Sequence, residues 1–208
     1  MTISTEDLLK SIMESFDRID YIKVEDIPNI DLYMDQVTTF MDAKMKQTTR
    51  YPGEDKILTK TMINNYAKND LLPPPIKKKY SKEHLLVLIF IYYFKGILSI
   101  SDIQKLLEPL TERFFQKDGD VTLSDIYEEV FSLKPEQVEA LKKDVQKTFM
   151  DAEKTFQNAK GEEQEFLQKF VFICLLGFDV YVKKLLIEKL IDQMNTDLKD
   201  QKDSKSKK

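Results

Sequence analysis

A run of ten consecutive apolar or aromatic residues constrains this chain more than any other feature. Leu85 to Phe94 reads LLVLIFIYYF and contains no strongly polar position. A helix that spans a bilayer needs roughly 20 such residues, so this run is too short to be a transmembrane segment. A helix that is apolar on all sides is normally buried on all sides. We therefore expect a central helix with the rest of its domain packed around it.

The residues on either side of this run predict where the central helix begins and ends. Pro73 to Pro75 favour an extended segment before it, because proline fixes φ and lacks an amide donor. Ser81 is a suitable N-cap for the central helix, and Gly96 is a suitable residue to close it. Ser99 and Asp102 then have capping-box spacing, which predicts the start of another helix.

The stretch from Leu58 to Leu72 has two different faces at helical spacing. Its apolar face carries Met62, Ile63 and Tyr66. Its opposite face is polar and carries Thr61, Asn64, Asn65 and Lys68. We expect the apolar face to dock on the central helix and the polar face to remain in solvent.

These segments resemble the winged helix-turn-helix of MerR-type transcription regulators. In that family a capped recognition helix contains a tyrosine and ends at Leu-Leu-Pro, and a basic wing and a Tyr-Ser or Tyr-Thr step follow. The resemblance covers residues 28–110, and its matching positions are Thr59, Tyr66, Leu71, Leu72, Pro73, Lys77 to Lys79, Tyr80 and Ser81. The whole chain also resembles an uncharacterised family from Gram-positive bacteria that is known as a domain of unknown function.

The chain departs from the MerR pattern within the recognition helix and the wing. Asn64 stands where the family usually has an arginine, Asn65 replaces a second tyrosine, and Asp70 replaces a glycine. The wing is also shorter than usual. The first helix of the motif should run from Asp31 to Lys44, with Tyr33, Val37, Phe40 and Met41 pointing inward.

We predict an all-α fold made of four segments. Residues 1–27 form an N-terminal amphipathic helix, residues 28–110 the MerR-like helix-turn-helix domain, residues 111–198 a C-terminal helical domain and residues 199–208 a disordered tail. A second apolar run, Phe170 to Phe178, is suited either to a subunit interface or to the core of a C-terminal helical bundle. The resemblance implies dimerisation through the C-terminal helices, and hence a homodimer.

Positive charge is concentrated in one part of the chain, although the net charge is −4. Residues 1–43 carry 3 basic and 10 acidic side chains, whereas residues 44–82 carry 10 basic and 3 acidic ones. The resemblance implies double-stranded DNA as the partner, with asparagine amides reading bases and lysines contacting phosphates. The expected contact residues are Lys60, Thr61, Asn64, Asn65, Lys68, Lys77, Lys78 and Lys79. A solvated basic face without a partner is the simpler alternative.

The sequence contains little that could support catalysis or metal binding. His84 is the only histidine and Cys174 the only cysteine. We expect His84 to be a partly exposed helix residue and Cys174 to be a small buried hydrophobe. A single cysteine favours a reducing, cytoplasmic compartment, and no signal-peptide pattern follows Met1.

We therefore predict no enzyme activity, no cofactor, no metal and no membrane partner. Two functions remain open. One is a DNA-binding transcription regulator, and the other is a protein-protein interaction module that retains a helix-turn-helix scaffold.

Overall fold

A computed structural model describes residues 5–16, 21–51, 54–132 and 135–206 of the chain. Within them, the prediction of an all-α fold class is confirmed, because the one sheet consists of two strands of two residues each. The helices are α1 (Thr5–Phe16), α2 (Met34–Met45), α3 (Lys60–Lys68), α4 (Lys82–Phe94), α5 (Ile100–Phe114), α6 (Leu123–Phe131), α7 (Pro135–Glu153) and α8 (Gly161–Ser206). Short 3-10 turns occur at Val24–Asp26 and Lys46–Thr48.

The two strands, β1 (Leu32–Tyr33) and β2 (Lys79–Tyr80), pair in antiparallel orientation. Leu32 lies opposite Tyr80, and Tyr33 lies opposite Lys79. The pair therefore connects the segment just before α2 to the segment just before α4.

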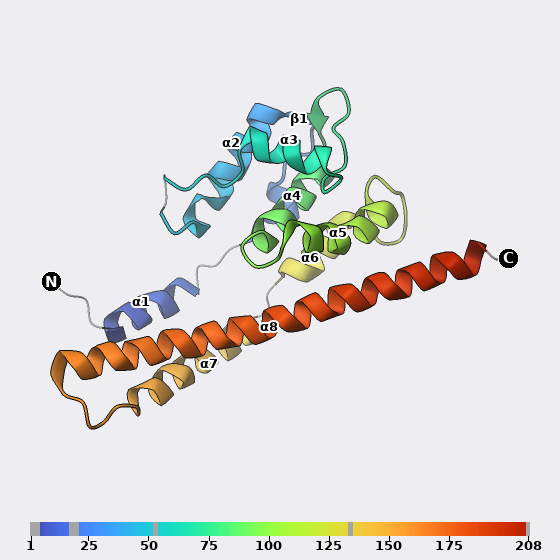
Figure 1. Ribbon diagram of the computed structural model, residues 1–208. Coiled ribbons are helices and arrows are strands. Elements are labelled where there is room, and N and C mark those ends of the chain that lie inside the picture. Colours follow the sequence, from blue (N-terminus) through green and yellow to red (C-terminus); the bar gives the residue numbers. More distant parts are fainter. Residues whose placement is uncertain (1–4, 17–20, 52–53, 133–134, 207–208) are drawn as a thin grey trace. The chain divides into compact units, whose positions relative to one another are not determined.

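The chain forms two compact units, and each combines segments that are far apart in sequence (Figure 1). Unit 1 takes its described helices α1, α7 and the first part of α8 from residues 1–21 and 132–186. Unit 2 takes α2 to α6 and the last part of α8 from residues 22–131 and 187–208. This division differs from the four expected segments, because α6 groups with α4 and because α8 contributes to both units.

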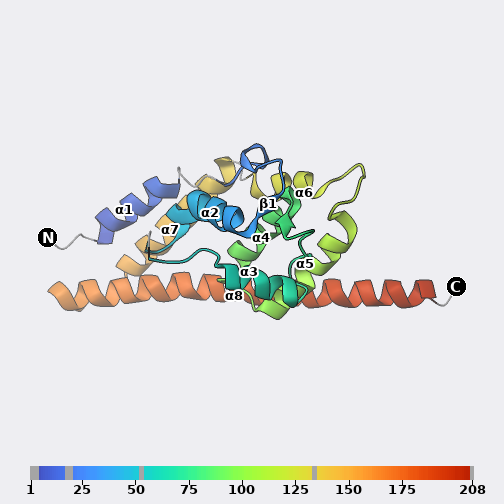
Figure 2. The same ribbon diagram turned by 90° about the horizontal axis from the view of Figure 1, so that it is seen from above.

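Helix α4 forms the core of unit 2, as its apolar run predicts. No residue from His84 to Ile91 exposes more than 4% of its surface. The helix contacts α5, α6 and β2, and Figures 1 and 2 show it lying among α2, α3, α5 and α6. Each large apolar side chain buried in this way contributes about 1.5–3 kcal/mol to stability.

An aromatic cluster explains why α6 belongs to unit 2. The ring of Tyr127 packs edge-on against Phe90 with centroids 5.7 Å apart, and Phe131 packs against Tyr93 at 5.1 Å. The Tyr127 hydroxyl donates to the Ile22 carbonyl over 2.7 Å. A buried tyrosine hydroxyl needs a hydrogen-bond partner, and the Ile22 carbonyl is that partner here. The contact links the start of unit 2 to α6.

The end of α8 is attached to α5 at a proline. Pro109 lies inside α5 and has no amide proton to donate to the Lys105 carbonyl four residues earlier. The side-chain amide of Asn195 donates to that carbonyl over 3.4 Å. Lys105 also forms an ion pair with Asp192 at 3.3 Å, and Ile191 beside it is buried. These contacts hold the last part of α8 against α5.

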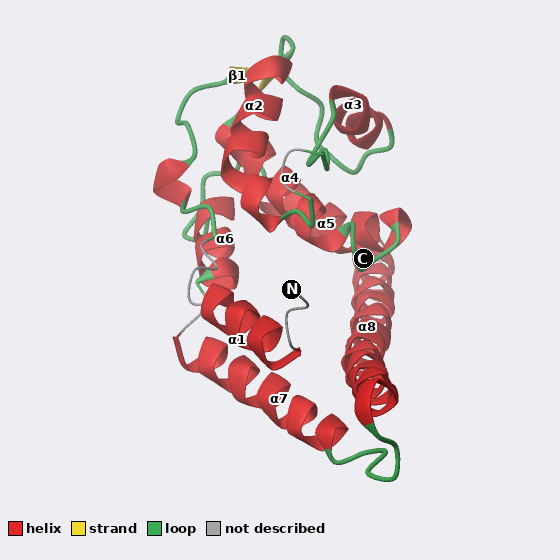
Figure 3. Cartoon of the chain, turned by 90° about the vertical axis from the view of Figure 1, so that its left-hand side faces the viewer, coloured by secondary structure: helices red, strands yellow, loops and turns green. Residues whose placement is uncertain are grey.

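In unit 1, α7 and the first part of α8 are joined by the loop of residues 154–160 (Figure 3). Phe149 and Phe172 meet edge-on at 5.3 Å, and the Gln168 amide donates to the Glu153 carbonyl over 2.6 Å. These contacts cover one side of α8 only. The second apolar run is therefore largely exposed, and Cys174 is exposed rather than buried as expected.

The end of α8 also corrects the expectation of a disordered tail. The helix continues to Ser206, so residues 199–206 are helical in the structure. These residues include no glycine or proline, and extending an existing helix requires no new nucleation step. Among the described residues, no helix combines the length and the apolar character needed to cross a membrane.

Candidate nucleic-acid interface

Helix α3 begins at a capped residue and ends at a left-handed one. The Thr59 hydroxyl accepts a hydrogen bond from the Met62 amide over 3.2 Å. At the other end Asp70 has a φ of 55°, and the amides of Leu71 and Leu72 both donate to the Tyr66 carbonyl. Glycine adopts this left-handed conformation at the lowest cost, which is a physical reason why the MerR pattern has a glycine where this chain has Asp70.

The two faces of α3 are as predicted. Ile63 exposes none of its surface and Tyr66 exposes 7%. Burial also raises the pKa of the Tyr66 hydroxyl above its ordinary value. On the opposite face the side chains are exposed, and these are Thr61, Asn64, Asn65 and Lys68.

The basic segment before α4 forms a tight hairpin. Ile76 and Lys79 exchange two backbone hydrogen bonds of 2.9 and 3.1 Å. The two residues between them, Lys77 and Lys78, have φ values of 50° and 65° and are both exposed. Such a turn favours Asn-Gly, and a lysine in the left-handed region costs roughly 1–2 kcal/mol. The hairpin tip therefore carries two positive charges in a conformation that lysine does not favour.

Two of the expected contact residues already have partners within the chain. The Lys60 ammonium forms an ion pair with Asp35 of α2. The Lys79 ammonium lies 5.3 Å from the centre of the Tyr33 ring. Tyr33 was predicted to point inward, but 54% of its surface is exposed. Side chains alternate along a strand, so the burial of Leu32 in β1 directs Tyr33 outward. The roles of Asp35 and Tyr33 as partners of lysines were not predicted from the sequence.

The loop between α2 and α3 is anchored on the C-terminal end of α4. The Lys95 ammonium donates to the Ile57 carbonyl over 2.6 Å, and burial lowers the pKa of Lys95. The hydroxyls of Thr48 and Tyr92 lie 2.6 Å apart. Between these anchors Arg50 is exposed, and its guanidinium lies 5.4 Å from the Tyr51 ring centre.

His84 is buried rather than partly exposed, with only 1% of its surface accessible. Its Nδ1 accepts a hydrogen bond from the Ser81 amide over 2.9 Å, which leaves the proton of the neutral ring on Nε2. That nitrogen lies 3.4 Å from the Pro74 carbonyl. The ring also meets Tyr80 and Phe115 edge-on. His84 thus ties the proline segment and the hairpin to the start of α4.

The sequence contains only part of the signal that would predict a buried histidine. His84 occupies the third helical position, where a glutamate or glutamine would complete a capping box. The aromatic ring of Phe115, which helps to cover it, follows α5 and lies far away in sequence. Burial lowers the pKa of His84, and hydrogen bonding to the Pro74 carbonyl and the charge of Asp31 oppose this effect.

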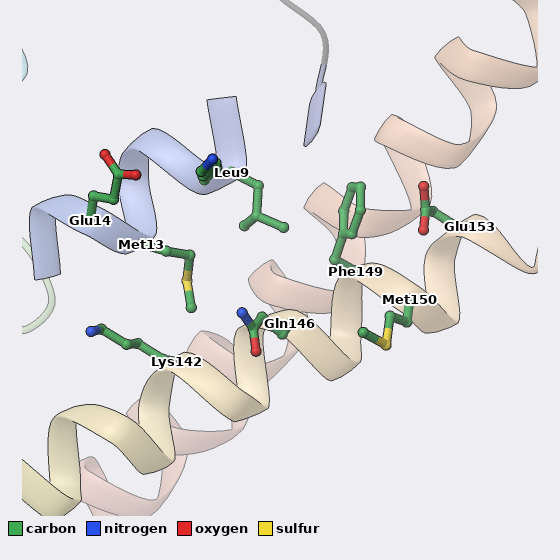
Figure 4. Close-up of a pocket in the computed structure, with 9 residues that line it drawn as sticks. Leu9, Met13, Glu14, Lys142, Gln146, Phe149, Met150 and Glu153 are labelled. Atoms are coloured by element: carbon green, nitrogen blue, oxygen red, sulfur yellow. The ribbon is translucent and has the colours of Figure 1, made fainter. Parts of the chain in front are cut away.

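Unit 1 contains a separate groove of about 590 Å³ between α1 and α7 (Figure 4). Leu9 and Met13 of α1 project toward the α7 side chains, which include Phe149 and Met150. Its charged lining residues comprise two lysines and two glutamates, namely Lys10, Glu14, Lys142 and Glu153. This mixed charge favours neither an anionic nor a cationic ligand. Among the described residues, no cluster of three metal-ligating side chains is present.

The fold and the site define an all-helical protein whose compact unit 2 presents one polar helix face and one basic hairpin. The chain belongs to the family described as domain of unknown function DUF1836, whose family model matches residues 22–130. This match runs from the start of unit 2 almost to the end of α6, so α6 is part of the family's unit. No curated protein and no solved structure matches the chain.

Proposed function

We propose that the protein is a transcription regulator that binds double-stranded DNA as a homodimer. In this proposal unit 2 is a MerR-like winged helix-turn-helix, with α3 in the major groove and the hairpin of residues 76–79 on the phosphate backbone. The observation that carries the proposal is the exposed polar face of α3 in the same unit as a hairpin that holds two lysines at its tip. Figure 1 shows helix α3 and the hairpin backbone at the upper edge of unit 2.

Each exposed side chain has a definite role in this proposal. Asn64 and Asn65 have the amide geometry for bidentate contacts to adenine, and Thr61 suits a thymine methyl group or a phosphate. Lys68, Lys77 and Lys78 supply attraction to phosphates that does not depend on sequence. Lys60 and Lys79 can contribute only by exchanging Asp35 and the Tyr33 ring for phosphate oxygens.

Dimerisation through α8 is supported by its uncovered apolar surface. Phe166, Phe170, Phe178 and Tyr181 expose between 55 and 69% of their surfaces. A buried aromatic side chain covers about 150–250 Å², so these four rings leave roughly 400–600 Å² in water. Exposed Ile173 and Leu185 enlarge this area beyond what monomers usually leave uncovered. The exposed apolar area of α8 thereby approaches the roughly 800 Å² that each partner buries in a stable interface.

The sequence of α8 favours an antiparallel arrangement of the two copies. If the two-fold axis lies between Ile173 and Cys174, Phe170 of one copy faces Gly177 of the other, and Phe166 faces Tyr181. Glu163 then faces Lys184, and the two helix dipoles are also opposed. A Cβ added at Gly177 would meet no atom of its own chain within 4 Å outside the adjoining helix backbone, so the packing of this chain does not require a glycine there.

Selection from a random pool of duplex DNA with the purified protein tests the proposal. We expect enrichment of an inverted repeat whose affinity falls steeply with salt, because two bound units release many counterions. Asn64→Ala and Asn65→Ala should each change the preferred sequence, at about 1–3 kcal/mol for a bidentate contact. If both variants kept the same preferred DNA sequence, α3 would not be the recognition helix.

A double substitution at the hairpin tip tests the wing without weakening the fold. Lys77→Asn with Lys78→Gly places the preferred Asn-Gly pair in the turn and removes two charges. The variant should be at least as stable as the natural protein, should bind all duplexes more weakly, and should lower the salt slope by about 2 per protomer, or about 4 for the bound dimer. Lys189→Gln on α8 is a charge control outside the hairpin. Equal losses in the two variants would indicate a general charge effect rather than a wing.

The second candidate function is a protein-protein interaction module built on the same scaffold. The net charge of −4 and the ion pair that engages Lys60 favour it. It predicts no sequence enrichment in the DNA selection, together with a stoichiometric complex between unit 2 and another protein that survives moderate salt.

A further inference from the structure

We infer that a groove in unit 2 binds a small apolar carboxylate, a function separate from DNA binding. The groove has a volume of about 340 Å³ and is formed by α4, α5, α6 and the last part of α8. Phe94, Leu110, Phe114, Val130 and Met194 contribute to its lining, and Arg113 is the one lining residue with a charged or polar side chain.

The chain leaves this apolar lining partly open to water. Val130 exposes 55% of its surface, and Phe94, Leu110 and Phe114 are half-buried. Apolar surface that stays in water gains about 25 cal/mol per Å² when a ligand covers it. A volume of about 340 Å³ lies at the small end of the 300–1,000 Å³ range of ligand pockets.

One wall of the groove is built around the proline in α5. Pro109 lines the groove, and its missing hydrogen bond is replaced by the contact from Asn195 to the Lys105 carbonyl. This contact also places Met194, the neighbour of Asn195, at the groove. The wall is thus held by a specific interhelix contact rather than by apolar packing alone.

Arg113 determines the charge of the proposed ligand. It lies in the last turn of α5 and is exposed, and among the described residues no carboxylate is within ion-pair distance of it. A guanidinium presents a planar set of donors that fits a carboxylate through two parallel hydrogen bonds. A hydrocarbon tail against the apolar lining and a carboxylate on Arg113 would satisfy both parts of the groove.

Other occupants fit the groove less well. A cationic amphiphile would be repelled by Arg113. A peptide segment would bring several amide groups, for which the lining side chains offer hydrogen bonds only at Arg113. A second copy of the chain would need a surface of about 800 Å², which exceeds what a groove of this volume provides.

Calorimetric titration of the purified 208-residue chain with three ten-carbon probes tests the inference. The probes are decanoate, 1-decanol and decyltrimethylammonium, which share a tail and differ in head-group charge. We expect decanoate to bind with a stoichiometry of one per chain and at least tenfold more tightly than the other two. No binding of decanoate, or equal binding of decanoate and decanol, would overturn the inference.

Four variants locate the binding site. Arg113→Gln should weaken decanoate at least tenfold and leave decanol unchanged, whereas the matched variant Arg50→Gln should change neither. Val130→Trp fills the groove from its exposed wall and should weaken both probes. Phe170→Ser removes apolar surface from α8. If this variant lost decanoate binding while Arg113→Gln kept it, the ligand would lie on α8 and the assignment to the groove would be wrong. Circular dichroism of each variant separates loss of the site from loss of the fold.

Discussion

Two apolar runs of similar composition have opposite surroundings in this protein. In α4 the residues from His84 to Ile91 expose at most 4% of their surfaces. In α8 the residues Phe170, Ile173 and Phe178 expose 56, 61 and 69%. The first run is enclosed by other helices of unit 2, whereas the second is covered on one side by α7. An apolar run therefore indicates that a helix needs to be covered, but it does not indicate by what.

The largest expected difference between the two runs is in stability. Leu88→Ala, at a fully buried position of α4, should reduce the free energy of unfolding by about 2–5 kcal/mol. Leu175→Ala, where 41% of the residue's surface is exposed on α8, should change the free energy of unfolding of the monomer by about 0.5 kcal/mol or less. Urea unfolding at a concentration where the protein is monomeric measures both. Equal losses of unfolding free energy in the two variants would mean that Leu175 of α8 is covered within its own chain.

A second comparison concerns association rather than folding. Phe170→Ala should weaken self-association by about 2 kcal/mol, or roughly 30-fold, because central aromatic residues dominate interfaces. Leu88→Ala, measured where it remains folded, should leave the dissociation constant unchanged. Sedimentation velocity over a range of concentrations gives both values. A natural protein that stays monomeric at high concentration would refute dimerisation through α8.

Cysteine crosslinking establishes the direction of the two α8 helices. Cys174 lies next to the proposed two-fold axis, so mild oxidation should produce a covalent dimer. In a Cys174→Ser background, Phe166→Cys alone should not crosslink, because antiparallel copies of this residue lie about 20 Å apart. Phe166→Cys combined with Tyr181→Cys should crosslink. Efficient crosslinking by the first variant alone would instead show a parallel arrangement.

Gly177→Ala should act in opposite directions on the monomer and on the dimer. Glycine inside a helix costs about 0.5–1 kcal/mol relative to alanine, and an added Cβ meets nothing within 4 Å, so the monomer should become more stable by that amount. If Phe170 of a second copy packs onto Gly177, the same methyl group should weaken association. Thermal unfolding tests the expected gain in monomer stability, and sedimentation of the same sample tests the expected loss of association. If the monomer became more stable and association did not change, the contact between the two α8 helices would not include Gly177.

The smallest expected effect is a dependence of unit 2 on pH. Burial lowers the pKa of His84 in the folded state, so the unfolded chain takes up its proton first as the pH falls. The stabilising contribution is therefore complete above the unfolded pKa of about 6.5 and is lost as the pH falls through the lower folded value. Urea midpoints between pH 7.5 and 5.5 should show this loss. His84→Gln, which retains a capping acceptor for Ser81, should show a flatter profile in the same range.

Features that depend on neighbouring residues were predicted well from the sequence. The cap at Ser99, the two faces of α3 and the burial of α4 all follow from short-range patterns, and the structure confirms them. The cap at Thr59 was expected from the resemblance, and the structure also contains it. The exposure of Thr61, Asn64, Asn65 and Lys68 was predicted for the same reason. Their contact with DNA stays a prediction.

Features that depend on distant residues were missed or wrongly predicted. His84 is covered partly by Phe115, Lys60 is engaged by Asp35, and α6 joins unit 2 through the contact of Tyr127 with Ile22. No local pattern encodes these pairs. The positive φ values of Lys77 and Lys78 were equally unpredictable, because the pairing of Ile76 with Lys79 imposes them on residues that do not favour them.

The sequence by itself determined the helical class, the position of the central helix and the polar face of α3. Helix formation, capping and amphipathic spacing act over four residues or fewer, so they can be read from the chain directly. The tertiary structure alone decided which apolar run is enclosed, which lysines are engaged and where the chain divides into units. Those outcomes depend on which distant segments meet, and burial is a property of the assembled surfaces rather than of any one segment.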